Sequence, residues 1–203
     1  MKETKPSAAD IAGLIRRDCG PEKDVADVCV REYARTAAGV TDFGLASATV
    51  LYLALFHLGL HTRILMGYVV TDNDYAFQPF QHIWCEAERR VFDVSVYPAT
   101  ASPFCRWAGI RPVMPQVNRA YGDTDAFYHR DTFRPGSALE EFSWVYGMPL
   151  TRILDAAPEP RMVETAALRD LSLPVTEENI GMIRAYAEGY QIGHSYRPDK
   201  PVV

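Results

Sequence analysis

Residues 44–70 read GLASATVLYLALFHLGLHTRILMGYVV, and residues 81–96 read QHIWCEAERRVFDVSV. The first stretch is apolar nearly all round as far as Gly59, which predicts a central, buried helix that ends at this glycine. Residues 61–70 are rich in branched side chains and precede the turn-forming TDND, so they predict a strand. Residues 81–96 predict two more strands joined by a short turn near 88–90. We therefore expect an α+β fold, with a buried central helix packed on an antiparallel sheet.

The register of the two strands in residues 81–96 follows from their apolar pattern. Successive side chains alternate between the two faces of a strand. The apolar face of this hairpin consists of Ile83, Cys85, Ala87, Phe92, Val94 and Val96. If both halves of that face point to the core, the numbers of paired residues have an odd sum, which places His82 opposite Ser95 and Trp84 opposite Asp93. His82 and Asp93 are then diagonal neighbours on the other, non-apolar face, with Cβ atoms about 7 Å apart.

A histidine beside a carboxylate suits general base catalysis. The carboxylate fixes the tautomer of the imidazole and stabilises the imidazolium that forms when the ring takes a proton. The alternative interpretation is an exposed polar face on an ordinary hairpin, where His and Asp are both common. The hairpin alone does not decide between the two.

The composition limits the classes of function. The chain has 203 residues, and 48% of them are hydrophobic. This length and this hydrophobic content are enough for one domain with a substantial core. The net charge is −5. Acidic and basic residues are interspersed, so we expect neither nucleic acid nor a membrane as a partner. The most apolar stretch, residues 45–60, is shorter than the roughly 20 residues of a membrane-spanning helix. The N-terminus has no apolar run typical of a secretory signal, and a cytoplasmic location is expected.

The spacing of cysteines and histidines predicts no metal site, and we expect no cofactor. The four cysteines are widely spaced, without a CxxC pair, at Cys19, Cys29, Cys85 and Cys105, so neither a zinc site nor a disulfide framework is indicated. No two histidines have the spacing of metal ligands. Cys29 and Cys85 lie on apolar faces and are expected to pack in the core. Cys105, in the segment PFCRWAG, is the one thiol with a route back to His82.

We expect a single domain over residues 1–203, made of three parts. Residues 1–39 predict two N-terminal helices, separated by the Cys-Gly-Pro break at 19–21. Residues 40–98 hold the central helix and the strands. Residues 99–203 combine an irregular or mixed segment, rich in proline, glycine and aromatic residues, with a C-terminal helical extension and a polar, proline-rich tail. The expected helices outside the central part lie at residues 7–18, 21–38, 139–146, 149–156, 161–171 and 177–190.

The order of elements in residues 40–98 resembles the transglutaminase-like superfamily, which has a papain-like fold. Its core is a helix with a cysteine at its N-terminus, then a strand with a histidine, then a strand with an aspartate. Residues 59–63, GLHTR, resemble the G-I-P-A-R turn of that family, and residues 65–68, LMGY, resemble its V-x-G-Y strand. His-x-Trp at 82–84 and a later aspartate, Asp93, follow in the same order. The stretch is also similar to short bacterial members that act as leader peptidases in natural-product biosynthesis.

This resemblance implies a scaffold for acyl transfer or for amide and peptide cleavage by a hydrolase mechanism. His82 is then the general base, Asp93 orients it, and Trp84 lines the acyl site. The implied substrate is a peptide or a small-molecule acyl compound, which a carrier or precursor protein can present.

The nucleophile of the family is missing from this chain. Counting back from Gly59 places the cysteine position at Gly44, or at Ala46 if the helix is slightly shorter. A helix N-terminus and a nearby imidazolium would lower the pKa of a thiol there, and free N–H groups would hold an oxyanion. Ser47 follows Ala46 but points about 100° around the helix from it, which makes it a weak substitute.

Three interpretations therefore stay open. The chain is an acyl-transfer or amide-cleaving scaffold whose cysteine at Gly44 or Ala46 has been replaced or is naturally absent. It is a pseudoenzyme that binds a peptide, a small molecule or a partner protein. Or it is a non-thiol isomerase or cyclase that uses His82 and Asp93 as a proton shuttle. The first interpretation predicts a cleft at the N-terminus of the helix 44–58, facing His82 and Asp93.

Overall fold

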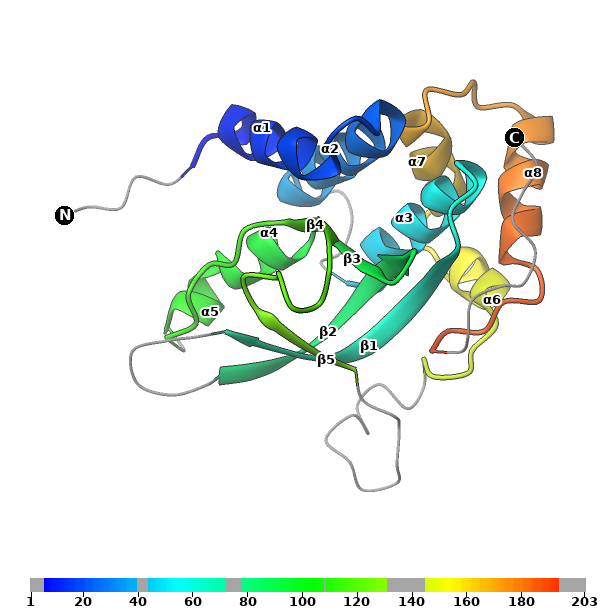
Figure 1. The fold of residues 1–203 in the computed structure, drawn as a ribbon. Helices are drawn as coiled ribbons and strands as arrows, with labels where there is room; N and C mark the ends of the chain where they lie inside the picture. Colours follow the sequence, from blue (N-terminus) through cyan, green and yellow to red (C-terminus); the bar gives the residue numbers. More distant parts are fainter. Residues whose placement is uncertain (1–5, 40–43, 72–77, 108, 131–144, 194–203) are drawn as a thin grey trace.

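The computed structural model describes residues 6–39, 44–71, 78–107, 109–130 and 145–193, and these form an α+β fold around a curled antiparallel sheet (Figure 1). The helices are α1 (Ala8–Cys19), α2 (Lys23–Ala37), α3 (Leu45–His57), α4 (Val96–Thr100), α5 (Pro103–Trp107), α6 (Leu150–Asp155), α7 (Met162–Asp170) and α8 (Glu177–Ala187). The strands are β1 (Thr62–Thr71), β2 (Gln78–Ala87), β3 (Arg90–Asp93), β4 (Gln116–Arg119) and β5 (Phe127–Arg130). The expected α+β class is confirmed. None of the described helices combines the length and the apolar character needed to cross a membrane.

The two N-terminal helices form where the sequence predicts them. Ser7 caps α1, because its hydroxyl accepts the backbone N–H of Asp10 while the Asp10 carboxylate accepts the N–H of Ser7. This reciprocal pair satisfies two donors that the first turn of a helix leaves free. Gly20 has a φ of 60° and separates α1 from α2, which then pack against each other.

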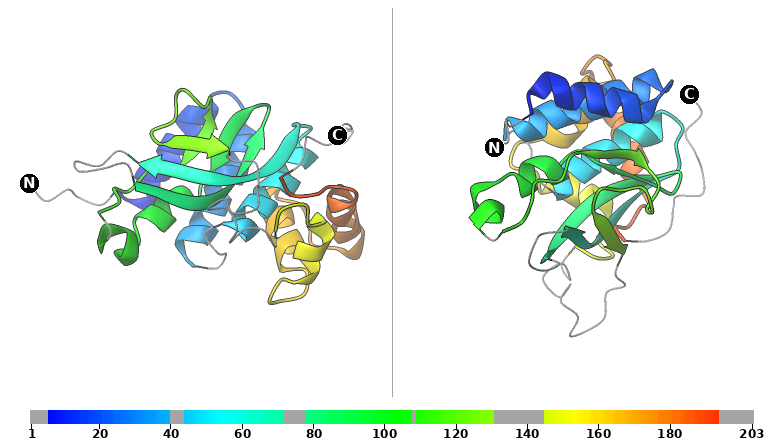
Figure 2. Two further views of the ribbon diagram at one scale, coloured as in Figure 1. Left: turned by 90° about the horizontal axis from the view of Figure 1, so that it is seen from below. Right: turned by 60° about the vertical axis from the view of Figure 1, so that its left-hand side comes forward.

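α3 is the central helix of the molecule. Every residue from Ser47 to Phe56 is buried, as expected for a helix that is apolar nearly all round. It packs on β1 and β2 and also contacts α2, α7 and α8 (Figure 2). Gly59, with a φ of 82°, and a backbone bond from Leu60 N to Leu55 O close its last turn, in the manner of a Schellman motif.

The strands follow the order β4-β3-β2-β1-β5. In the β2–β3 pair, Cys85 lies opposite Phe92 and Ala87 lies opposite Arg90. These pairs have the odd sum that the apolar pattern predicts, so the predicted register is confirmed. Residues 88–89 form the turn between the strands, with φ values of 49° and 64°, as in the two-residue turns whose twist suits a hairpin.

β3 is shorter than the sequence predicts. A strand was expected as far as Val96, but β3 ends at Asp93 and α4 begins at Val96. The cause is the Asp93 side chain, which accepts the backbone N–H groups of Ser95 and Val96. Such a local turn offers the backbone an alternative to the strand ladder. Val96 consequently packs with the second apolar cluster, whereas Phe92 and Val94 stay in the main core.

Buried apolar clusters lie on both faces of the sheet. The face toward the helices carries Ile83 and Cys85, which belong to the main core together with α3. The opposite face, expected to be non-apolar, carries a second cluster of Leu65, Val69, Trp84, Val91, Val96, Val113, Ala126 and Tyr128. His82 and Asp93 lie on this face and are only 4% and 1% exposed. The interpretation of an exposed polar face on an ordinary hairpin is therefore wrong.

The second half of the chain is partly regular. The segment expected to be irregular or mixed contains α5, β4 and β5 within its described part, together with the end of α4. The helical patterns at 149–156, 161–171 and 177–190 correspond to α6, α7 and α8. Most of the helix expected at 139–146, and the tail from residue 194, lie outside the described residues.

Candidate functional site

Asp93 is the centre of the site and accepts five hydrogen bonds. Its Oδ1 accepts from the backbone N–H groups of Ser95 (3.1 Å) and Val96 (3.0 Å) and from the Ser95 hydroxyl (2.9 Å). Its Oδ2 accepts from His82 Nε2 at 2.8 Å and from the Tyr128 hydroxyl at 2.8 Å. The two backbone N–H groups can only donate, which favours an ionised carboxylate as their acceptor.

The electrostatics of the site agree with an ionised Asp93. Burial by itself would raise the pKa of Asp93, but the His82 imidazole and the hydroxyl groups of Tyr128 and Ser95 together hold that pKa below its ordinary value. Burial next to the carboxylate raises the pKa of Tyr128 well above its ordinary value, so Tyr128 stays a donor. Hydrogen bonds to the charged form of an acid favour that form.

The orientation of His82 leaves one ring nitrogen as a base. Nε2 faces the Asp93 carboxylate and must carry a hydrogen there, because Asp93 can only accept. In the neutral ring Nδ1 is then the acceptor, and no residue in the described part of the chain hydrogen-bonds it. The ring of Phe80 lies beside the imidazole, with centroids 5.6 Å apart. The predicted pairing of His82 with Asp93 on one face is thus confirmed, and its chemistry points to proton transfer at Nδ1.

Residues from β2, from the turn before α4 and from β5 meet at Asp93. The β2–β3 register brings His82 into reach, and the turn into α4 supplies Ser95. Tyr128 lies on β5, which pairs with β1 opposite Val69. In the order of the sheet, two strands separate β5 from β3, which in a flat sheet corresponds to about 14 Å. The contact between Tyr128 and Asp93 therefore depends on the curl of the sheet (Figure 1).

The start of α3 belongs to the other side of the sheet. Side chains on β2 alternate, so His82 and Trp84 point away from the face on which Ile83 packs with α3. Leu45 and Ala48, in the first turn of α3, pack against that same helical core. The structure therefore assembles the dyad of His82 and Asp93 on one face and the N-terminus of α3 on the opposite one.

None of the three expected nucleophile positions, Gly44, Ala46 and Ser47, provides a nucleophile to His82. Gly44 is the N-cap of α3, and a Cβ built there would meet nothing within 4 Å. Ala46 is half-buried. Ser47 is buried, and its hydroxyl lies 3.5 Å from the Thr36 hydroxyl of α2. The serine is thus engaged with the helical core.

Trp84, expected to line the acyl site, is packed inside the second cluster. It is only 1% exposed, and its Nε1 donates to the Tyr121 hydroxyl at 3.2 Å. Its ring meets the Tyr128 ring edge-on, with centroids 5.2 Å apart. In this arrangement Trp84 supports Tyr128 and does not face an open site.

Sequence reasoning missed two members of the site, Ser95 and Tyr128. Ser95 carried a usable signal, since an aspartate followed two residues later by serine often forms a local turn. Tyr128 was one of many aromatic residues in the second half of the chain. No local pattern links it to Asp93, because their contact depends on the pairing of β5 with β1.

Cys29 and Cys85 are buried in the core. A hydrogen bond with the Cys19 side chain, together with burial, raises the pKa of Cys29 well above its ordinary value, and burial does the same for Cys85. Cys105 is half-exposed on α5. Within the described residues, no group of three or more His, Cys, Asp and Glu side chains is arranged to hold a metal ion.

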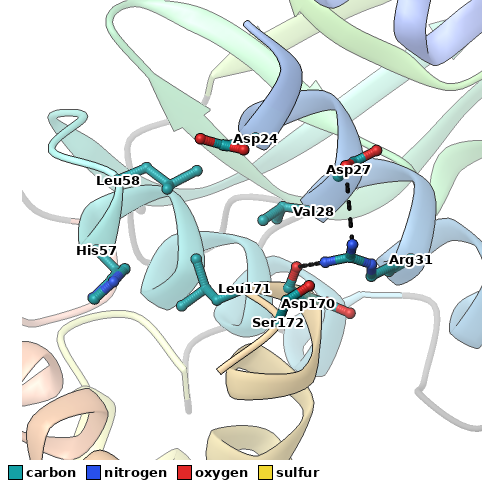
Figure 3. A pocket seen from close by; sticks show the side chains of 9 residues that line it. All are labelled: Asp24, Asp27, Val28, Arg31, His57, Leu58, Asp170, Leu171 and Ser172. Carbon is teal, nitrogen blue, oxygen red and sulfur yellow. Dashed lines mark hydrogen bonds and ion pairs between the residues drawn. The ribbon is translucent and has the colours of Figure 1, made fainter. Parts of the chain in front are cut away.

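A cavity of about 220 Å³ lies between α2, the end of α3 and the end of α7 (Figure 3). It is lined by Asp24, Asp27, Val28, Arg31, His57, Leu58, Asp170, Leu171 and Ser172. The Arg31 guanidinium donates to the backbone oxygen of Asp170 and lies 3.9 Å from an Asp27 oxygen. The chain thus supplies its own cation to this acidic cavity.

Comparison with known proteins does not place the chain in a family. No protein-family model, curated protein or solved structure matches it. The resemblance to the transglutaminase-like superfamily stays a prediction from the sequence.

Proposed function

We propose that this chain is a transglutaminase-like scaffold for acyl transfer or amide cleavage in which His82 is the general base, Asp93 orients it, and no thiol takes part. The observation that carries the proposal is the Asp93 carboxylate, which holds the Nε2–H of His82 at 2.8 Å and leaves Nδ1 as the base. The substrate class is a peptide or a small-molecule acyl compound.

In this mechanism the nucleophile is a water molecule or an amine of the second substrate. Its oxygen or nitrogen forms a bond to the carbonyl carbon while its proton moves to His82 Nδ1. The tetrahedral intermediate then breaks its bond to the leaving alcohol or amine, which takes the proton back from Nδ1. Asp93 stabilises the imidazolium between the two steps, so no net charge remains on the protein at the end.

The absence of a thiol from the mechanism is supported by the placement of α3. Gly44 and Ala46 have no nucleophilic atom, and Ser47 contacts Thr36 on the helical side. Direct attack needs only the dyad and a bound nucleophile, whereas an acyl-enzyme needs a side chain on the face of His82.

The test is hydrolysis and aminolysis of p-nitrophenyl esters and amino-acid p-nitroanilides by the purified chain. We expect turnover above the buffer rate, and a loss of about 100-fold or more in His82→Asn. The matched control is His57→Asn, the same change at a half-buried histidine whose Nδ1 bonds the Tyr186 hydroxyl at 3.0 Å, and it should keep the activity. Equal activity in His82→Asn and the unaltered chain would overturn the proposal.

A second experiment asks whether a thiol belongs to the site. Cysteine is placed by Gly44→Cys and separately by Ala46→Cys, and the rate of alkylation by iodoacetamide is measured against pH. A thiol at a helix N-terminus has a lowered pKa wherever the imidazole lies, so the readout is the difference between each cysteine variant and the same variant with His82→Asn. We expect the same thiol pKa with and without His82. A thiol pKa that rises when His82 is replaced would replace direct attack by an acyl-enzyme route.

A second candidate function is binding without catalysis, as in a pseudoenzyme. The near-complete burial of His82 and Asp93 favours it, because a buried, fully bonded carboxylate also stabilises a fold. Turnover of no ester or anilide by a folded chain, with His82→Asn affecting only stability, would select this candidate.

A further inference from the structure

Tyr128 and His82 share a single oxygen of Asp93. Both donate to Oδ2 at 2.8 Å, whereas Oδ1 is taken up by the turn at Ser95 and Val96. The two donors come from different strands, and the tyrosine reaches Asp93 only across the curled sheet. The hydrogen bond from Tyr128 is therefore the one contact described here that fixes Oδ2 from the side of β5.

The Tyr128 hydroxyl can only be the donor in its hydrogen bond with Asp93. Asp93 can only accept, and Tyr128 is 4% exposed, with its ring held edge-on against Trp84. If the Tyr128 hydroxyl rotated away toward solvent, the buried Asp93 carboxylate would lose a hydrogen bond, which is costly. The hydroxyl therefore stays on Oδ2 and favours the ionised form of the acid.

We propose that Tyr128 is a positioning residue for His82 that acts through Asp93: its hydroxyl keeps the carboxylate ionised and holds Oδ2 where it receives the Nε2–H, so that Nδ1 is presented as the base. This inference rests on the proposed function of the dyad, but its test does not need turnover. Without Tyr128, Oδ2 has a single donor, and both the ionisation of Asp93 and the angle of the imidazole become less constrained.

The test is the titration of the Asp93 carboxyl carbon, followed by ¹³C NMR and assigned with Asp93→Asn, in the unaltered chain and in Tyr128→Phe. Phenylalanine keeps the ring against Trp84 and removes only the hydroxyl. We expect the Asp93 midpoint to rise by about one pH unit in Tyr128→Phe. The control is Tyr121→Phe, because Tyr121 also donates to a buried carboxylate on this face, that of Glu86, and it should leave the Asp93 midpoint unchanged.

A second variant keeps the test open if Tyr128→Phe does not fold. 3-Fluorotyrosine placed at position 128 retains the ring and the hydroxyl but is a more acidic donor, so it should lower the Asp93 midpoint. Midpoints that do not move in either variant, or that move equally in Tyr121→Phe, overturn the proposal. A moved midpoint in a chain without ester or anilide turnover would retain the role of Tyr128 toward Asp93 and remove the proposed function instead.

Discussion

Asp170 and Glu32 offer the sharpest test of the helical half of the structure. Both carboxyl groups are buried, at 1% and 0% exposure, and both pair with Arg35, whose Nε lies 2.9 Å from Glu32 Oε2 and whose Nη2 contacts Asp170 Oδ1. The second oxygen of Asp170, Oδ2, is buried without a hydrogen-bond partner. Two carboxylates against one guanidinium leave one negative charge in excess, so the cluster is neutral only when it keeps a proton.

The magnitude follows from the titration of Asp170. Burial, opposed by Arg35 and reinforced by Glu32, raises the pKa of Asp170 from 3.8 to about 7. Between these pH values the folded chain keeps a proton that the unfolded chain has released. The free energy of unfolding therefore falls as the pH rises through this window, and the loss is complete above about pH 7. At 1.36 kcal/mol per pH unit the window corresponds to about 4 kcal/mol at most.

Asp170→Asn removes this dependence, because asparagine has nearly the same shape, still accepts from Arg35 and does not titrate. Relative to the unaltered chain, the stability of the variant should rise by about 2–3 kcal/mol from pH 5 to pH 8, because about two pH units of the window lie above pH 5. Urea unfolding at four pH values, followed by tryptophan fluorescence, measures the difference. The control is Asp155→Asn, which removes a carboxylate that is 64% exposed, and its effect should stay below about 1 kcal/mol at every pH. A difference for Asp170→Asn that is flat, or that falls with pH, would refute the reasoning.

Two further predictions concern other parts of the fold. In the native chain Cys105 should react with a thiol reagent much faster than the buried Cys85, as mass spectrometry of the labelled peptides would show; equal rates would contradict the packing of β2. Gly193→Ala should destabilise by about 1–2 kcal/mol because Gly193 has a φ of +83° and its Cβ would lie 2.7 Å from the Tyr146 ring. Gly181→Ala, in the open middle of α8, should instead stabilise by up to about 1 kcal/mol, and the two changes having the same sign in urea unfolding would count against the structure.

The hairpin shows how far a local pattern can predict a site. The apolar residues Ile83, Cys85 and Phe92 define which faces meet, and because strand side chains have a period of two, the register follows without any knowledge of the rest of the chain. That register places His82 and Asp93 together, and they form a hydrogen bond. The buried character of α3 follows in the same way, from its lack of any polar stripe.

The surroundings of the pair could not be predicted, because they depend on contacts between residues far apart in the sequence. Tyr128 reaches Asp93 only when β5 adds to β1 and the sheet curls. That curl also converts the expected non-apolar face into a second core, with Trp84 inside it. A pattern of alternating side chains tells which residues share a face, but it does not tell what covers that face.

The opposite placement of α3 and His82 bears directly on the type of chemistry. In an acyl-enzyme mechanism the nucleophile and the base must lie within hydrogen-bond reach, yet Leu45 and Ala48 pack on the helical core while His82 points to the other face. Gly44 caps α3 and Ala46 lies in its first turn. A cysteine at either position would therefore lie at the start of this helix, on the helical side of the sheet. Nδ1 of His82 has no partner among the described residues, and in the proposed mechanism it takes the proton of a nucleophile that arrives with the substrate. For this reason alkylation of the introduced thiols and turnover by the unaltered chain test the proposal from two independent sides.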